Sequence, residues 1–213
     1  MLFRALALTT LPLASGKIYF SETFGEGWES RWTPSEWKKS EGTQGEFQSA
    51  TGKYFGDEKE DAGIQTSADS KFYGLSAGFD TFSNEGKDLI IQYQAKYEKD
   101  IECGGGYVKI GPKMADAKTF GDPTEYNIMF GPDKCGYTKR THAIFNYKGK
   151  NVLKKSDLAY KQDDFGISHL YRMTVKPDNT VKVEVDQTEL YSGNMKDDWE
   201  LLAPKVISDP DDK

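Results

Sequence analysis

The chain has 213 residues and a formal net charge of −6, and 37% of its residues are hydrophobic and 13% aromatic. An acidic surface disfavours contacts with nucleic acid and with anionic membranes, so neither is expected as a partner. The aromatic content argues against disorder, and the length suits one large domain with a substantial core.

Residues 1–16 are predicted to be a signal peptide. Arg4 supplies a basic start, residues 6–13 form a short apolar run, and residues 14–16 are small enough for cleavage. The apolar run is too short to span a membrane, and no later segment approaches that length, so membrane insertion is not expected. The alternative, a buried N-terminal strand, is disfavoured because the run lacks alternation of apolar and polar residues.

The rest of the chain consists of short β-type runs separated by turn residues. Residues 89–97 alternate, with Leu89, Ile91, Tyr93, Ala95 and Tyr97 on one face. Further strands are predicted at residues 107–110, at residues 126–130 ending before Gly131-Pro132, and at residues 142–147 ending before Lys148-Gly149-Lys150.

The clearest hairpin is predicted at residues 170–186. Its two strands alternate apolar and polar residues around a turn at Pro177-Asp178-Asn179. Many short strands with frequent turns indicate an all-β, antiparallel β-sandwich. Residues 207–213 are acidic, contain proline and lack periodicity, so they are expected to begin a linker or an extended element.

The two cysteines of the chain are Cys103 and Cys135. A signal peptide implies an oxidising compartment, where two cysteines are expected to pair. Closing this loop would restrict the unfolded chain by roughly 3–4 kcal/mol on the entropy model. Two separate free thiols are the alternative.

A catalytic interpretation rests on the spacing of Glu184, Asp186 and Glu189. This E-x-D-x-x-E pattern occurs in some retaining β-glucan hydrolases, whose carboxylates act as nucleophile and acid/base. The competing interpretation is ordinary hairpin chemistry, which the flanking strand residues favour. The chain has no G-x-S-x-G, H-E-x-x-H or phosphate-loop motif. His142 lies in a predicted strand and is expected to be structural, so the chain is predicted not to be an enzyme.

A carbohydrate-binding interpretation rests on Tyr107, Lys109, Tyr126 and Asp133. Tyr107 and Lys109 are two residues apart on one predicted strand and therefore point the same way. A disulfide would draw the glycine-rich strand start towards the turn at Asp133. On spacing alone, an ordinary polar sheet surface is the alternative.

At these residues the chain resembles the calreticulin/calnexin family. The matching runs are Cys-Gly-Gly-Gly-Tyr-Val-Lys at 103–109, Glu-Tyr-Asn-Ile-Met-Phe-Gly-Pro-Asp-Lys-Cys-Gly at 125–136, and shorter stretches at 27–32, 56–58, 65–67, 144–152, 169–171 and 176–180. The likeness extends over residues 17–213. The short loop at residues 57–64 favours the soluble members over the membrane-anchored ones, whose anchor would follow residue 213.

The resemblance implies a jelly-roll lectin domain of the legume-lectin, concanavalin A-like type at residues 17–204. It implies a monomeric chaperone of the endoplasmic reticulum lumen that binds monoglucosylated, high-mannose N-glycans on unfolded glycoproteins. By position, Tyr107, Lys109, Tyr126 and Asp133 match the family's sugar-binding residues, and Met129 and Ile144 match its apolar contacts. Cys103 and Cys135 match its disulfide.

The resemblance also implies a structural Ca²⁺ ion. By the same resemblance, its ligands would be largely main-chain oxygens at Thr23, Glu60 and Ala62. The chain has no EF-hand loop. Taken alone, residues 57–61 are equally well interpreted as a solvated charged loop.

Residues 205–213 match the start of the family's proline-rich acidic arm, which recruits a disulfide isomerase. The rest of the arm, the returning strands with an Asp and a Trp for the sugar site, and the retrieval signal are expected to be missing from this chain. The alternative function is therefore a polypeptide-binding chaperone, or a calcium-linked interaction protein, without sugar binding.

Overall fold

The computed structural model describes residues 16–161 and 163–202. Residues 1–15 of the predicted signal peptide and all of the predicted arm at residues 205–213 lie outside the described residues. The proposed domain boundaries therefore stay predictions.

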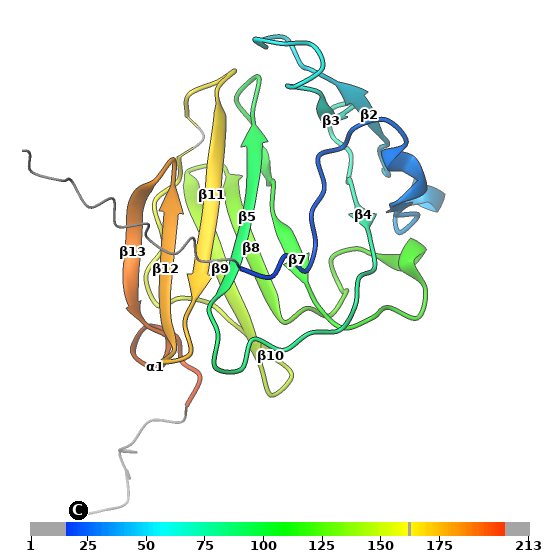
Figure 1. The fold of residues 1–213 in the computed structure, drawn as a ribbon. Coiled ribbons are helices and arrows are strands. Elements are labelled where there is room, and N and C mark those ends of the chain that lie inside the picture. The colour runs from blue at the N-terminus through cyan, green and yellow to red at the C-terminus, as the bar shows by residue number, and fades with distance from the viewer. Residues whose placement is uncertain (1–15, 162, 203–213) are drawn as a thin grey trace, which may run out of the picture.

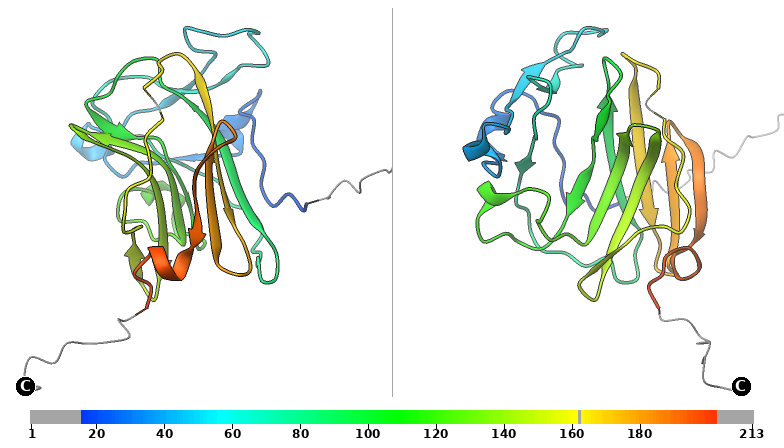
Figure 2. Two further views of the ribbon diagram at one scale, coloured as in Figure 1. Left: turned by 90° about the vertical axis from the view of Figure 1, so that its left-hand side faces the viewer. Right: turned by 180° about the vertical axis from the view of Figure 1, so that it is seen from behind.

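Two antiparallel sheets face each other and form a sandwich (Figures 1 and 2). The first has the order β13 (Thr188–Asn194), β12 (Thr180–Val185), β11 (Ser168–Val175) and β5 (Leu89–Lys96). The second has the order β10 (Lys150–Val152), β9 (Thr138–Tyr147) and β8 (Ile128–Cys135), and both β6 (Cys103–Gly105) and β7 (Val108–Ile110) pair along the free side of β8.

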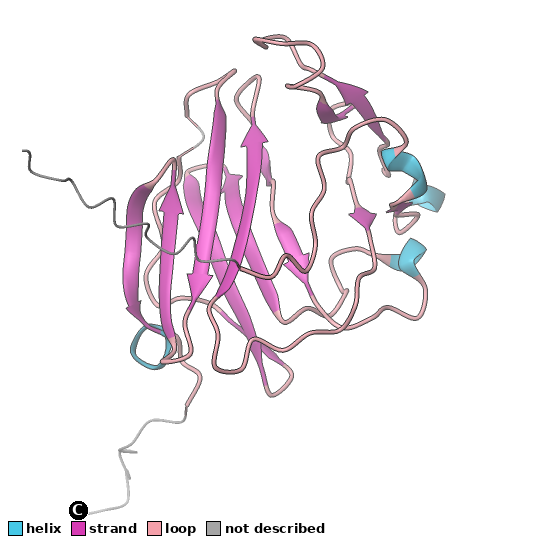
Figure 3. Cartoon of the chain, in the orientation of Figure 1, coloured by secondary structure: helices cyan, strands magenta, loops and turns pink. Residues whose placement is uncertain are grey.

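Smaller elements lie at one side of the sandwich and at its end (Figures 1 and 3). Two short sheets pair β1 (Thr33–Pro34) with β4 (Leu75–Ser76), and β2 (Phe47–Ala50) with β3 (Gly63–Thr66). Three 3-10 helices span Trp28–Ser30, Lys39–Glu41 and Ala117–Thr119, and the α-helix α1 spans Met195–Asp198.

The core lies between the two sheets. Phe130 of β8, Tyr171 and Met173 of β11, and Val181 and Val183 of β12 are each 0% exposed and belong to one cluster. Alternate residues of each strand supply this cluster because successive side chains point to opposite faces of a sheet. The predicted all-β, antiparallel sandwich is confirmed.

The predicted hairpin forms as expected. Tyr171, Met173 and Val175 of β11 are paired with the three alternating valines of β12, and all six side chains are buried. Asn179 takes a positive φ of 68° in the turn, a conformation that asparagine adopts more readily than most residues. The predicted strand at residues 89–97 is likewise confirmed as β5.

The prediction that a strand ends before Gly131-Pro132 is wrong, because β8 continues to Cys135. Proline normally interrupts a ladder because it has no N–H to donate. Here the N–H of Thr141, the residue opposite Pro132, donates to Leu158, and the Pro132 carbonyl accepts a hydrogen bond from Gly106 at 3.0 Å. Pro132 therefore lies where the ladder with β9 needs no hydrogen bond from it.

The carboxylate of Glu22 organises the N-terminal segment. It accepts hydrogen bonds from the guanidinium of Arg31 at 2.8 Å, the Trp32 indole at 3.0 Å, and the main-chain N–H groups of Thr23 and Phe24. The side chain is only 7% exposed. These bonds, above all those from Arg31, lower the pKa of Glu22 to about 2.

Glu22 is expected to make stability depend on pH in the acid range. Since its pKa is lowered in the folded state, its contribution is present above the unfolded value of 4.5 and disappears as the pH falls towards about 2. In urea unfolding at a series of pH values, Glu22→Gln should be less stable than the wild type at pH 6, and the difference should vanish by pH 2. Glu29→Gln, at an exposed carboxylate, is the control. A difference that stays constant with pH would contradict this role.

Candidate functional site

The outer face of the second sheet carries the residues that the sequence singled out. Lys109, Met129 and Ile144 are partners in one row across β7, β8 and β9. Tyr126, Met129 and Ile144 form a buried cluster separate from the main core. Because side chains alternate along a strand, Asp133 shares the face of Met129, and Tyr107, just before β7, shares that of Lys109.

The Lys109 ammonium is held by two main-chain carbonyls and two aromatic rings, which together form its binding pocket. Its Nζ donates to the carbonyl oxygens of Gly121 at 3.1 Å and Asp122 at 3.3 Å. The same atom lies 5.2 Å from the ring centroid of Tyr126 and 5.8 Å from that of Phe120, within the range of cation–π attraction. These contacts fix the position of the ammonium.

Asp133 lies beside Tyr107 at the other end of this face. Gly105 is the partner of Asp133 in the ladder, and a Cβ on Gly105 would overlap the Tyr107 ring and lie 3.0 Å from Asp133 Oδ1. Only glycine at this position lets the tyrosine ring and the carboxylate approach so closely. The Tyr107 side chain is nevertheless 42% exposed, so its ring is available to a ligand.

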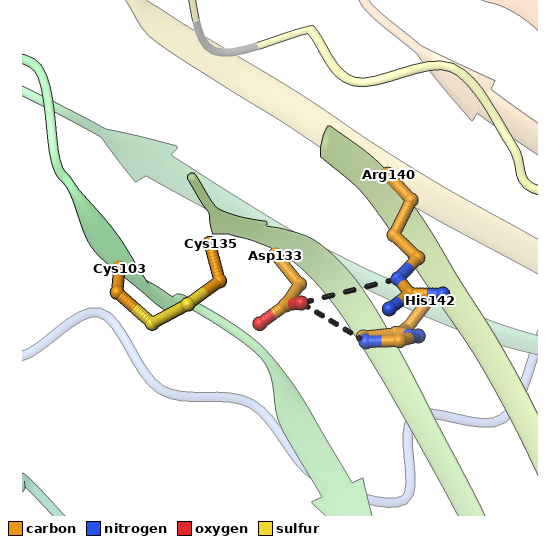
Figure 4. Close-up of a disulfide and its surroundings, with 5 residues drawn as sticks. All are labelled: Cys103, Asp133, Cys135, Arg140 and His142. Atoms are coloured by element: carbon orange, nitrogen blue, oxygen red, sulfur yellow. Dashed lines mark ion pairs between the residues drawn. A yellow bond between two sulfur atoms is a disulfide. The ribbon is translucent and has the colours of Figure 1, made fainter. Parts of the chain in front are cut away.

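His142 and Arg140 of β9 reach the same carboxylate (Figure 4). His142 Nε2 lies 3.4 Å and Arg140 Nε 4.0 Å from Asp133 Oδ2. The Tyr107 and His142 rings meet edge to face, with centroids 6.4 Å apart. Sequence reasoning treated His142 as structural and passed over Arg140. The signal that could have found them is their alternation with Ile144 on one strand, which puts all three on the outer face.

Partial burial determines the protonation states of the titratable side chains on this face. Burial raises the pKa of the Tyr107 and Tyr126 hydroxyls, and the negative charge of Asp122 raises both further. Burial lowers the pKa of Lys109 and of His142. At neutral pH the tyrosines are therefore protonated donors, His142 is a neutral imidazole, and Asp133 is the acceptor next to them.

The predicted disulfide between Cys103 and Cys135 is confirmed and borders this face (Figure 4). The two cysteines are direct partners in the ladder between β6 and β8. Gly105 and Asp133 are partners two positions further along the same ladder. The disulfide therefore ties β6 to β8 beside Asp133. Without it, three ladder pairs would be left to hold the short strand β6 in place.

Together these groups can bind a polyhydroxylated ring. Hydroxyls, an ammonium and a carboxylate supply both donors and acceptors within one face, and the buried cluster of Tyr126, Met129 and Ile144 gives this face an apolar floor. A sugar presents the complementary pattern, with hydroxyls around its rim and C–H groups on its faces.

The residues predicted as calcium ligands lie in exposed or half-buried segments. Thr23 follows Glu22, and Glu60 and Ala62 belong to the turn before β3. The side chains of Asp57 and Asp61 are engaged in the same turn, where backbone N–H groups donate to them and lower their pKa. Nowhere in residues 16–161 and 163–202 do three His, Cys, Asp or Glu side chains gather to hold a metal ion. Calcium accepts main-chain carbonyl oxygens as ligands, and Thr23, Glu60 and Ala62 each carry one.

The E-x-D-x-x-E residues have structural contacts. Glu184 and Glu189 are paired across β12 and β13, and Lys182 Nζ lies 2.7 Å from Glu184 and 3.7 Å from Glu189. Asp186 lies in the hairpin turn with a φ of 51°, accepts a hydrogen bond from Leu170 N and lies 2.6 Å from His169 Nδ1. This geometry favours the hairpin interpretation over a catalytic pair.

No helix among the described residues is both long and apolar enough to cross a bilayer.

Comparisons with known proteins identify the family. The model of the calreticulin family matches residues 20–213. Calreticulin of Homo sapiens is 49% identical over 209 residues, which are 97% of this chain and 49% of that protein. Calreticulin of Chlamydomonas reinhardtii is 47% identical over 210 residues, 97% of this chain and 50% of that protein. The chain thus spans about half the length of the curated relatives that it matches.

A solved structure supports the same assignment. The T. cruzi calreticulin globular domain superimposes with a TM-score of 0.77 and 33% identity, covering 85% of this chain and 68% of that one. The sandwich is accordingly the concanavalin A-like, jelly-roll fold that the sequence predicts. With a family match over nearly its whole length and close relatives from animals and algae, this chain belongs to the calreticulin family.

Proposed function

We propose that this chain is the lectin module of a chaperone of the endoplasmic reticulum lumen. It binds monoglucosylated, high-mannose N-glycans on newly made glycoproteins and assists their folding and quality control. The observation that carries the proposal is the outer face of β7, β8 and β9. There Tyr107, Lys109 and Asp133 lie on the same face as the buried apolar cluster of Tyr126, Met129 and Ile144, in a chain of the calreticulin family.

The residue roles follow from the chemistry of each group. Asp133 accepts hydrogen bonds from sugar hydroxyls, while Lys109 and the hydroxyls of Tyr107 and Tyr126 donate to sugar oxygens. Met129 and Ile144 are only 8% and 6% exposed, so they form an apolar floor beneath the ring and meet its C–H surface at their outer edge alone. Because the polar groups are partly desolvated, their hydrogen bonds to a sugar are stronger than on an open surface.

Replacing Tyr107 and Asp133 together by alanine is expected to weaken glycan binding about 30-fold or more. The change removes one neutral and one charged hydrogen-bonding partner, together worth about 2 kcal/mol or more. Calorimetric titration with a glucose-capped mannose oligosaccharide measures it. The double variant Tyr54→Ala with Asp69→Ala, at an exposed tyrosine and an exposed aspartate, is the matched control. Unchanged affinity in the Tyr107 and Asp133 variant would refute the assignment.

We also propose that Ca²⁺ is bound through main-chain oxygens of Thr23, Glu60 and Ala62. The carboxylates of Asp57 and Asp61 support this proposal, because their hydrogen bonds to main-chain N–H groups fix the turn that contains Glu60 and Ala62. The same titration with a calcium chelator measures how far sugar binding depends on the ion. The further partner that we propose is a disulfide isomerase, recruited through the family's proline-rich arm, and the proposed state of this domain is a monomer.

The alternative, a polypeptide-binding chaperone without sugar binding, has one observation in its favour. Tyr54, Phe55, Phe165 and Ile167 are all exposed, and the Tyr54 ring packs against Gly166, so these apolar side chains lie at one end of the molecule. Such a patch is a candidate contact for unfolded chains. Suppressed aggregation of a non-glycosylated client, with no binding to the oligosaccharide, would favour this function over the first.

A further inference from the structure

The position of the Lys109 ammonium depends on a loop that the sugar face does not itself contain. Its two hydrogen bonds go to the main-chain carbonyls of Gly121 and Asp122. A carbonyl in a loop can only fix a side chain if the loop is itself fixed. The anchoring of residues 117–122 therefore decides where the charge of Lys109 lies.

Residues 35–37, more than 80 positions earlier in the chain, hold this loop from its far side. Ser35 Oγ donates to the Phe120 carbonyl at 2.5 Å, and Glu36 N donates to the Lys118 carbonyl at 2.7 Å. The Trp37 indole covers Gly121 so closely that a Cβ on this glycine would overlap the ring. Ser35 is buried, so its hydrogen bond is shielded from competition with water.

The holding segment is in turn attached to β4 and to the residues before it. Ser35 N donates to the Gly74 carbonyl at 2.9 Å, next to the pairing of β1 with β4. The Trp37 and Phe72 rings meet edge to face at 5.5 Å. A continuous set of contacts thus runs from residues 72–76 through residues 35–37 and Gly121 to the Lys109 ammonium.

We infer that Ser35 and Trp37 are positioning residues for glycan binding, which act on the sugar through Lys109. Ser35 fixes the turn at Phe120, and Trp37 fixes the carbonyl of Gly121 by packing on its Cα. Glycine is required at position 121 because any side chain there would displace the indole. This inference rests on the proposed lectin function and adds two residues, distant in sequence, that tune it.

Trp37→Ala is expected to weaken oligosaccharide binding about tenfold, because Lys109 loses a fixed partner for a charged hydrogen bond. In the double variant with Lys109→Ala, the binding should be no weaker than in Lys109→Ala alone, since both changes remove the same contact. Ser35→Ala, which removes a single hydroxyl, should weaken binding in the same direction if Trp37→Ala folds poorly. Trp37→Phe should retain most of the affinity.

A second readout separates positioning from general stability. In the wild type, burial lowers the pKa of Lys109. In Trp37→Ala the loop at residues 117–122 loses its packing, so the Lys109 ammonium becomes more exposed to water. Its pKa, measured by NMR of its side-chain ε carbon, should then rise towards its ordinary value. Tyr19→Ala is the matched control, because Lys17 lies over the Tyr19 ring as Lys38 lies over the Trp37 ring, but Tyr19 stacks on Phe82 instead of packing on Gly121. It should change neither the affinity nor the pKa.

Two outcomes would overturn the inference. One is additive loss of affinity in the double variant, which would mean that Trp37 acts independently of Lys109. The other is a pKa of Lys109 that stays unchanged in both Trp37→Ala and Ser35→Ala. Absence of glycan binding by the wild type would instead refute the proposed function. The pKa measurement would still test whether residues 35–37 fix the loop that binds the Lys109 ammonium.

Discussion

Gly131→Ala should lower the free energy of unfolding by about 3 kcal/mol and remove most of the glycan affinity. Gly131 has a φ of +144°, and a Cβ there would overlap the Tyr93 hydroxyl and lie 2.6 Å from the Gly106 carbonyl oxygen and 2.8 Å from Tyr107 Cα. Two of these three atoms are backbone and cannot rotate away. Overpacking of this kind costs about 1–3 kcal/mol, and the unfavourable φ adds about 1–2 kcal/mol.

The same position couples the core to the sugar face. The Tyr93 hydroxyl donates to the Gly106 carbonyl at 2.6 Å, and its ring stacks on Tyr171 in the first sheet. A methyl group at position 131 would push this hydroxyl inwards and the Tyr107 backbone outwards. Stability and affinity should therefore fall together, as urea unfolding and calorimetric titration of the folded fraction would measure.

Gly149→Ala is the matched control for this change. Gly149 also has a positive φ, +77°, but no atom lies within 4 Å of the Cβ position. It should cost only the backbone strain, about 1 kcal/mol, and leave glycan binding intact. Equal effects of the two substitutions would show that close contact at Gly131 is unimportant.

Strands whose own residues alternate between apolar and polar could be predicted from the sequence. The β5 strand and the β11–β12 hairpin alternate apolar and polar residues, and one face of each packs into the core. The extent of β8 could not be predicted, because Gly131-Pro132 is ordinarily a stop signal. Its continuation depends on Gly106 and Leu158, which meet this region only in the folded chain.

The candidate site was predictable in its residue types but not in its arrangement. The resemblance to a family singled out Lys109, Met129 and Ile144, but their alignment in one row is set by strand register, which pairs residues far apart in sequence. No local pattern links Ser35 and Trp37 to a loop near residue 120. Those contacts arise from tertiary packing alone.

Trp199→Ala should lower the free energy of unfolding by about 4 kcal/mol, within the usual range for truncating a buried tryptophan. Trp199 is 0% exposed and joins the two sheets, since its ring meets Phe145 of β9 at 5.4 Å and Tyr191 of β13 at 5.7 Å. Its Nε1 donates to the Ala143 carbonyl at 2.9 Å. Alanine would leave both a cavity and an unpaired buried carbonyl, and urea unfolding would measure the combined cost.

Trp199→Phe separates the two contributions, because it keeps most of the ring but removes the indole N–H. It should cost about half as much, and a loss as large as that of alanine would assign the effect to the hydrogen bond instead of the ring. Glycan affinity of the folded fraction should survive both changes. Ala143 faces the core, whereas its neighbours His142 and Ile144 face outwards, so a defect behind β9 loosens the sandwich without moving the side chains that meet the sugar.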